Sequence, residues 1–142
     1  MNVVEKQVVV SASLETIFRI YQDVDHWNQW DPDTKSSTLN QGLTLGSKGS
    51  LTPTKGSTVP MEVTSIQVNR HFTVTSKTAL YRMDFEHELE AVEGGTRVVH
   101  RVTFAGLLKP ILTRMIAPQV DKGLPITLQR LKMQAEEAQA AK

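Results

Sequence analysis

The feature that most constrains the fold is a change in the spacing of apolar residues at Gly106. Between Lys35 and Gly106 the apolar runs are short, and glycine, proline and asparagine separate them, which is typical of strands joined by turns. After Gly106 apolar residues recur every three or four positions, which predicts a long C-terminal helix. The chain therefore combines an antiparallel sheet with one helix large enough to cover it.

The predicted strands cover residues 3–10, 35–41, 47–53, 59–68, 71–78, 80–91 and 96–105. Two short helices are predicted between the first two strands: Ser11 or Ser13 can cap the first, and the second runs from Val24 to Trp30. Because proline removes a backbone donor, Pro118 and Pro125 predict one bent C-terminal helix or two abutting ones. The predicted fold class is α+β, a seven-stranded curved antiparallel sheet wrapped around the C-terminal helix.

Composition excludes several classes of protein. The 142 residues fit a single domain spanning 1–142, and a net charge of +1 with 6% aromatic residues argues against nucleic-acid binding. With no cysteine, disulfide scaffolds, thiol nucleophiles and cysteine metal sites are excluded. No apolar run approaches the roughly 18 residues of a membrane span, and the N-terminus does not resemble a signal peptide. We therefore expect a cytoplasmic protein without stable membrane insertion.

The last two predicted strands have a predictable register. A two-residue turn at Glu93-Gly94 makes the numbers of paired residues sum to 187, which sets His87 opposite His100 on the inner face. The same register places two opposite-charge pairs on the outer face, Glu90 with Arg97 and Glu86 with Arg101. Such cross-strand pairs contribute roughly 0.2–1 kcal/mol each, which favours this register.

Two inward-facing imidazoles permit three interpretations. His87 and His100 can be hydrogen-bonded core residues, can contact the polar group of a ligand, or can act as general acid and base. We expect no metal, because a third ligand is missing: the nearby acids Asp84, Glu86 and Glu88 alternate towards the outer face. No nucleophile elbow, phosphate-binding loop or zinc-protease motif is present.

The apolar residues of the inner face predict a cavity between the sheet and the helix. Trp27 is expected to plug one end of the sheet, whereas Trp30 is either a plug or a gate at the pocket mouth. Four flexible methionines, Met61, Met83, Met115 and Met133, suit either an ordinary core or an adaptable pocket. The candidate ligand-binding residues are Trp30, Met61, Val63, Phe72, Val74, Met83, Phe85, His87, His100, Val102, Phe104, Leu112 and Met115.

An empty cavity of this kind is costly. At about 24 cal/mol per Å³, an empty apolar space of roughly 300 Å³ costs about 7 kcal/mol, comparable with the whole stability of a domain. Such a space should collapse, hold water or hold a ligand. The glycine-rich loops between Gly42 and Gly56 are the predicted rim.

Five segments in order resemble a known superfamily. They are VVVSAS at 8–13, WNQWDP at 27–32, EGGTRVVH at 93–100, FAG at 104–106 and LKMQAE at 131–136. Together they are similar to the START-like superfamily, which includes polyketide cyclase/dehydrases and lipid-transfer proteins. The resemblance implies the helix-grip fold and a hydrophobic cavity between the sheet and the helix.

The resemblance leaves three functions open. The first is binding or transport of a small hydrophobic or amphipathic ligand, lipid-like or polyketide-like. The second is a cyclase or dehydratase acting on an aromatic polyketide-like substrate, with His87 or His100 as acid or base. The third is a co-chaperone-like protein-interaction module, which would require an exposed apolar patch. No cofactor is expected, and the oligomeric state is left between monomer and homodimer.

Overall fold

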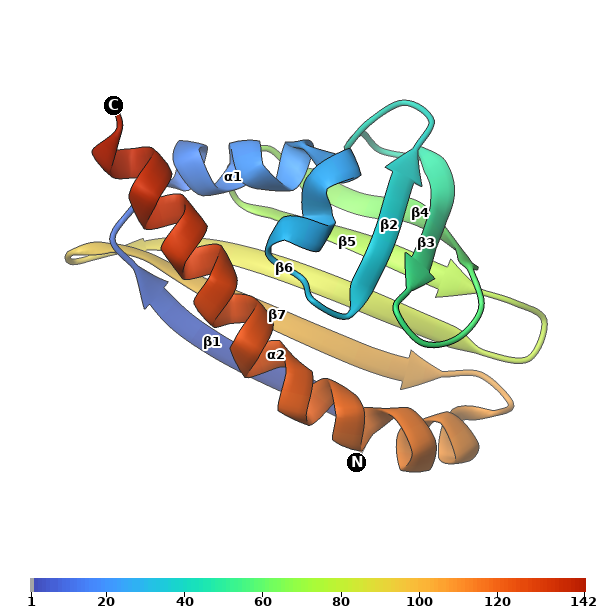
Figure 1. Cartoon of the computed structure of the whole chain (residues 1–142). Helices are drawn as coiled ribbons and strands as arrows, with labels where there is room; N and C mark the ends of the chain where they lie inside the picture. Colours follow the sequence, from blue (N-terminus) through green and yellow to red (C-terminus); the bar gives the residue numbers. More distant parts are fainter. Residues whose placement is uncertain (1) are drawn as a thin grey trace.

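Seven antiparallel strands form one curved sheet, as the sequence predicts (Figure 1). The computed structural model describes residues 2–142. Its strands are β1 (Val3–Val10), β2 (Thr34–Leu39), β3 (Lys48–Pro53), β4 (Val59–Gln67), β5 (His71–Lys77), β6 (Arg82–Val92) and β7 (Gly95–Ala105). They lie in the order β1-β7-β6-β5-β4-β3-β2, so β1 is the edge strand beside β7, and β2 is the other edge strand. The predicted boundaries agree with these to within two residues.

The hairpin of β6 and β7 has the predicted register. His87 pairs with His100, and Val92 pairs with Gly95 across the turn. Gly95 has φ +151°, and a Cβ there would lie 2.0 Å from the carbonyl oxygen of Val10, so only glycine fits beside β1. On the outer face two predicted charge pairs are present, Arg97 with Glu90 and Arg101 with Glu86.

Two short helices join β1 to β2, as predicted. They are α1 (Leu14–Gln22) and the 3₁₀ helix η1 (Val24–Gln29). Ser13 caps α1, because its hydroxyl oxygen accepts a hydrogen bond from the backbone N–H of Thr16 at 3.1 Å. The buried face of α1 carries Ile17, Phe18 and Tyr21, the apolar stripe expected from helical spacing.

The C-terminal helix α2 (Lys109–Ala140) is continuous and lies diagonally across β7 and β1 (Figure 1). Of the two arrangements predicted, a single helix is the one present. Pro118 and Pro125 are both exposed, so each missing backbone hydrogen bond lies on the side of the helix that faces water. Within residues 2–142 no helix has both the length and the apolar character needed to cross a bilayer.

The C-terminal end of α2 is fastened to the junction of β1 and α1. A carboxylate oxygen of Glu136 accepts a hydrogen bond from the backbone N–H of Ser11 at 2.8 Å. The side-chain oxygen of Gln139 accepts from the backbone N–H of Ser13 at 3.0 Å and from the hydroxyl of Thr16 at 2.8 Å. These contacts fix the last turns of α2 against α1.

The two halves of α2 cover the sheet unequally. The second half buries Leu128, Leu131 and Ala135 almost completely in the larger core cluster, with α1 and η1. The first half contributes one small buried residue, Ala117, to a second, smaller cluster, together with four residues that are only half-buried: Leu112, Ile116, Val120 and Leu124. Beneath them Val4, Met83, Val102 and Phe104 of the sheet are buried and Phe85 is half-buried. The cover over that part of the sheet is therefore looser.

The packing of the second half of α2 predicts different costs of truncation on its buried and exposed faces. Leu131→Ala should lower the free energy of unfolding by about 2–5 kcal/mol, because Leu131 is fully buried. Met133→Ala is the matched control, since Met133 is 62% exposed, and should change it by at most about 0.5 kcal/mol. Urea denaturation measures both. Equal losses at the two positions would contradict this packing of α2.

Candidate functional site

The paired histidines lie on the inner face, beneath α1 and η1. His87 and His100 are directly opposite each other, and their ring centroids are 4.7 Å apart. His100 is buried and His87 is half-buried. Because the pair belongs to a continuous antiparallel ladder, the backbone fixes the position of both rings.

Tyr21 joins this pair to α1. Its hydroxyl and Nε2 of His100 are 2.8 Å apart and share a hydrogen bond. Tyr21 is completely buried, and burial raises the pKa of its hydroxyl, so the group stays protonated. Tyr21 is on the buried face of α1 and is not among the candidate site residues predicted from the sequence. Helical spacing gives the buried face and does not show which strand residue that face meets.

Rings surround the Tyr21–His100 hydrogen bond. Phe72 stacks on His87 with centroids 4.0 Å apart and planes 5° from parallel. Tyr21 makes edge contacts with Phe72 at 4.9 Å and with Trp30 at 5.7 Å. Nδ1 of His87 donates a hydrogen bond to the carbonyl oxygen of Phe72 at 3.2 Å, which places the proton of the neutral ring on Nδ1.

The interior is uncharged. Burial lowers the pKa of His87 to about 4, and burial together with the neighbouring His87 lowers the pKa of His100 well below its usual value. Both rings are therefore neutral near pH 7. Among residues 2–142 the buried polar side chains are threonines, serines and His100, with no Lys, Arg, Asp or Glu.

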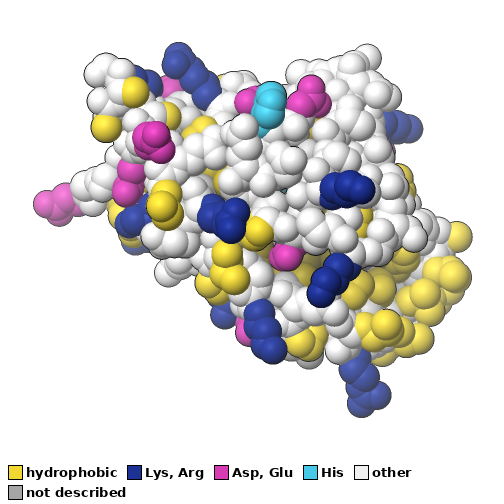
Figure 2. Space-filling model, viewed as in Figure 1, with side chains coloured by type: hydrophobic (Ala, Val, Ile, Leu, Met, Phe, Trp, Pro, Cys, Tyr) yellow, Lys and Arg dark blue, Asp and Glu magenta, His cyan; other side chains and the backbone are white. Residues whose placement is uncertain are grey.

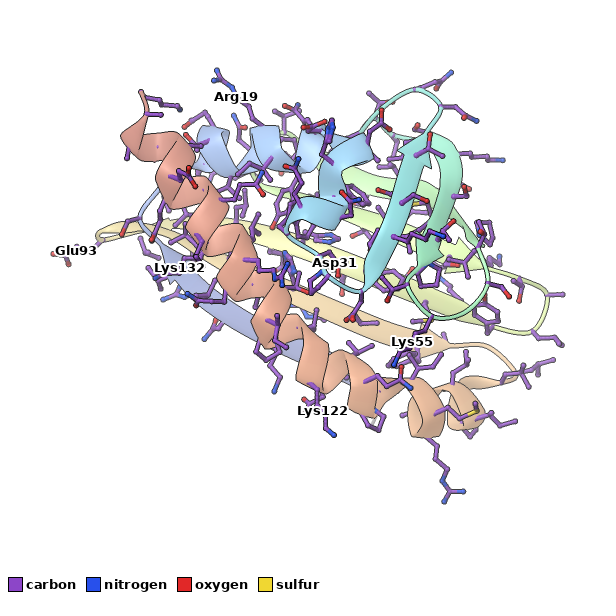
Figure 3. The ribbon with its side chains drawn as sticks, viewed as in Figure 1. Arg19, Asp31, Lys55, Glu93, Lys122 and Lys132 are labelled. Atoms are coloured by element: carbon purple, nitrogen blue, oxygen red, sulfur yellow. The ribbon has the colours of Figure 1, made fainter. Side chains whose placement is uncertain are left out.

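Asp31 is the carboxylate beside this interior. Figure 3 shows it next to the middle of α2, whereas Lys55 and Lys122 lie at the outer surface. Asp31 is half-buried and accepts hydrogen bonds from the hydroxyl of Thr34 and the backbone N–H of Asp33, both at 3.0 Å. Burial raises the pKa of Asp31.

The two tryptophans differ in hydrogen bonding. Nε1 of Trp27 donates to the carbonyl oxygen of Tyr21 at 2.8 Å, which agrees with a structural plug. Trp30 is only 3% exposed, yet its Nε1 has no hydrogen-bond partner. An unsatisfied buried donor costs about 1–3 kcal/mol, so the Trp30 N–H is a group that an acceptor oxygen would stabilise.

The other candidate residues fall into both core clusters. Met61, Val63, Phe72 and Val74 join Trp30 in the larger cluster, and Met83, Phe85, Val102, Phe104 and Leu112 belong to the smaller one. Met115 and Met133 are not interior residues, since they are 65% and 62% exposed on α2. Met115 is one position from Ile116 and Met133 is two positions from Leu131, and both of these neighbours face the sheet. Because side chains rotate about the helix axis from one position to the next, the two methionines point towards water.

Two surface hollows lie away from the interior. One, of about 660 Å³, is on the outer face of the sheet and is lined by residues that include His71, Glu88 and Arg97. The other, of about 470 Å³, lies at the junction of β1 and α1. Neither lies between the sheet and α2, so the interior cavity expected from the sequence stays a prediction.

An exposed apolar patch lies where α2 begins. We call it the apolar end and define it by Leu80, Leu107, Ile111 and Met115, which are 51–80% exposed. A hydrogen bond of 2.9 Å from the backbone N–H of Leu108 to the carbonyl oxygen of Leu80 joins its two loops. Figure 2 shows hydrophobic side chains gathered over this part of the surface. The apolar end is next to the loosely covered smaller cluster.

The fold and the buried site together define the class of protein: a helix-grip protein with an uncharged aromatic interior. The family model described as polyketide cyclase/dehydrase and lipid transport matches residues 1–136. The chain belongs to this family, which confirms the resemblance stated from the sequence. None of the curated proteins compared with the chain matches it.

Solved structures share the fold at low sequence identity. Protein MLL2253 from Mesorhizobium loti is 14% identical with a TM-score of 0.76, over 95% of this chain and 97% of that one. Ara h 8.0201 is 17% identical with a TM-score of 0.73, over 95% and 97%. DynU16, a putative protein in the dynemicin biosynthetic locus, is 15% identical with a TM-score of 0.74, over 100% of this chain and 50% of that one. These identities establish the fold alone.

The buried histidines predict a loss of stability in mild acid. Their pKa values are lower in the folded state than the unfolded value of about 6.5, so their contribution is complete above pH 6.5. For His87 it falls by up to about 1.4 kcal/mol per pH unit as the pH drops from about 6.5 towards the folded pKa of about 4, and His100 adds a loss in the same direction. Urea denaturation across this range should show the slope.

His87→Gln should flatten that dependence. His26→Gln is the control, because a hydrogen bond to Asp23 raises the pKa of the exposed His26, so its replacement should steepen the dependence instead. An unchanged slope in His87→Gln would show that His87 is not held neutral in the fold.

Proposed function

We propose that this protein binds a small, largely apolar molecule between the sheet and the first half of α2. The observation that carries the proposal is the unequal cover of the sheet. Val102 and Phe104 are at most 2% exposed, yet of the α2 side chains in their cluster only the small Ala117 is buried, and the four larger ones are half-buried. An apolar guest in this region would gain about 25 cal/mol per Å² of buried surface. The family description, which includes lipid transport, supports the same function.

The apolar end is the proposed route of access. It borders the first turns of α2, and residues 105–120 contain no Asp or Glu that would need to be desolvated as a guest passes. The route would lead from the surface at Leu107 and Ile111 to the side chains of the smaller core cluster. At its inner end lie the rings around Tyr21.

A binding role is better supported than acid–base catalysis. A general base works best with a pKa near the working pH, whereas burial lowers the pKa of both His87 and His100. His100 is also engaged with the Tyr21 hydroxyl. The paired rings therefore suit a neutral hydrogen-bonding wall.

Filling the proposed site should block binding. Ile116→Trp adds bulk where α2 faces the smaller cluster and should weaken binding of a neutral alkylnaphthalene, followed by fluorescence, by at least about tenfold. Ile126→Trp is the matched control on the same helix, because Ile126 is 53% exposed, and should bind as the unaltered protein does. The site is placed wrongly if both variants keep full affinity, or if both lose it equally.

The apolar end also favours a second candidate function, a protein-interaction module. Exposed apolar patches of this kind mark contact surfaces for proteins as well as openings for ligands. The double variant Leu107→Ser with Ile111→Ser separates the two functions. If the protein is an interaction module, the double variant should no longer capture a partner in pull-down experiments, and the unaltered protein should not bind the alkylnaphthalene. If it is a ligand-binding protein, the double variant should keep its affinity for the alkylnaphthalene.

A further inference from the structure

Nε1 of Trp30 is a fully buried donor with no hydrogen-bond partner, in the ring cluster around Tyr21. Three neighbouring groups are already hydrogen-bonded within the protein: the Tyr21 hydroxyl with Nε2 of His100, Nδ1 of His87 with a carbonyl oxygen, and Nε1 of Trp27 with another. An indole N–H can only donate. The group that completes this site must therefore bring an acceptor atom.

The uncharged interior also limits which charge the ligand can carry. No Lys or Arg among residues 2–142 is buried, and Asp31 borders the interior with a carboxyl group. A carboxylate brought inside would lose its hydration without meeting a cation, which costs several kcal/mol. A cation would gain from the aromatic faces, but it offers no acceptor for the indole N–H.

We propose that the molecule bound inside is uncharged and carries a carbonyl oxygen that accepts a hydrogen bond from Nε1 of Trp30. This inference rests on the proposed function and names its ligand class: neutral carbonyl compounds, such as ketones, quinones and esters, are preferred over fatty-acid anions. The rings of Tyr21 and Trp27 lie 5.7 and 6.1 Å from that of Trp30 between centroids, and such aromatic surroundings suit a flat, conjugated ligand.

Three matched naphthalene probes test the ligand class. They are a neutral 2-acylnaphthalene, a 2-alkylnaphthalene with the same number of carbons, and a naphthalene sulfonate. Isothermal titration should show the ketone binding about 5- to 10-fold more tightly than the alkyl probe, the ratio expected for one hydrogen bond. The sulfonate should bind more weakly than either. Trp30→Phe should remove the preference, so that the ketone and the alkyl probe bind this variant equally.

Trp27→Phe is the matched control, because the Trp27 N–H is already bonded within the protein. It should keep the ratio between ketone and alkyl probe even if it lowers stability. The chain has two tryptophans, so its ¹H–¹⁵N spectrum contains two indole signals, which the variants assign. Should Trp30→Phe fail to fold, the unaltered protein still gives a result: the Trp30 indole signal should shift with the ketone and not with the alkyl probe.

Each alternative outcome is decisive. If the ketone and the alkyl probe bind equally and the Trp30 signal does not move, the inference is wrong while the proposed function stands. If the sulfonate binds most tightly and Lys55→Ala weakens it, the polar group of the ligand lies at the surface and the inference is overturned. If none of the three probes binds, the proposed function and the inference both fail.

Discussion

The hydrogen bond between Tyr21 and His100 is the interaction on which the interior depends. It joins α1 to β7 at 2.8 Å and is closed off from water by aromatic rings. A buried hydroxyl and a buried imidazole would each be costly alone, and together they satisfy one another without a charge. The same pair sets the chemistry of the space around it, because it leaves the interior polar in places but uncharged.

The sheet and the helix have separate tasks in this arrangement. The antiparallel ladder of β6 and β7 fixes the two histidines, and the second half of α2 locks the larger core through Leu131 and its neighbours. The first half of α2 packs less closely over the smaller cluster. With a rigid larger core and a loosely covered smaller cluster, a guest molecule could enter while the rest of the fold stays intact.

Much of this fold could be predicted because its signals are local. Alternation along β6 and β7 and the turn at Glu93-Gly94 were sufficient to set His87 opposite His100. The site was less predictable, since Tyr21 reaches His100 across 79 positions of sequence and no spacing rule connects them. Met115 shows a second limit: an apolar residue on a long helix can face water, and only the packed structure fixes the rotation of the helix.

A crystal structure of the protein with a neutral 2-acylnaphthalene tests the central claim most directly. We expect the naphthalene to lie between the sheet and the first half of α2, with its carbonyl oxygen about 2.9 Å from Nε1 of Trp30. A probe seated in the hollow on the outer face of the sheet would contradict it. So would a probe inside the protein whose carbonyl oxygen points to solvent while the Trp30 N–H remains without a partner.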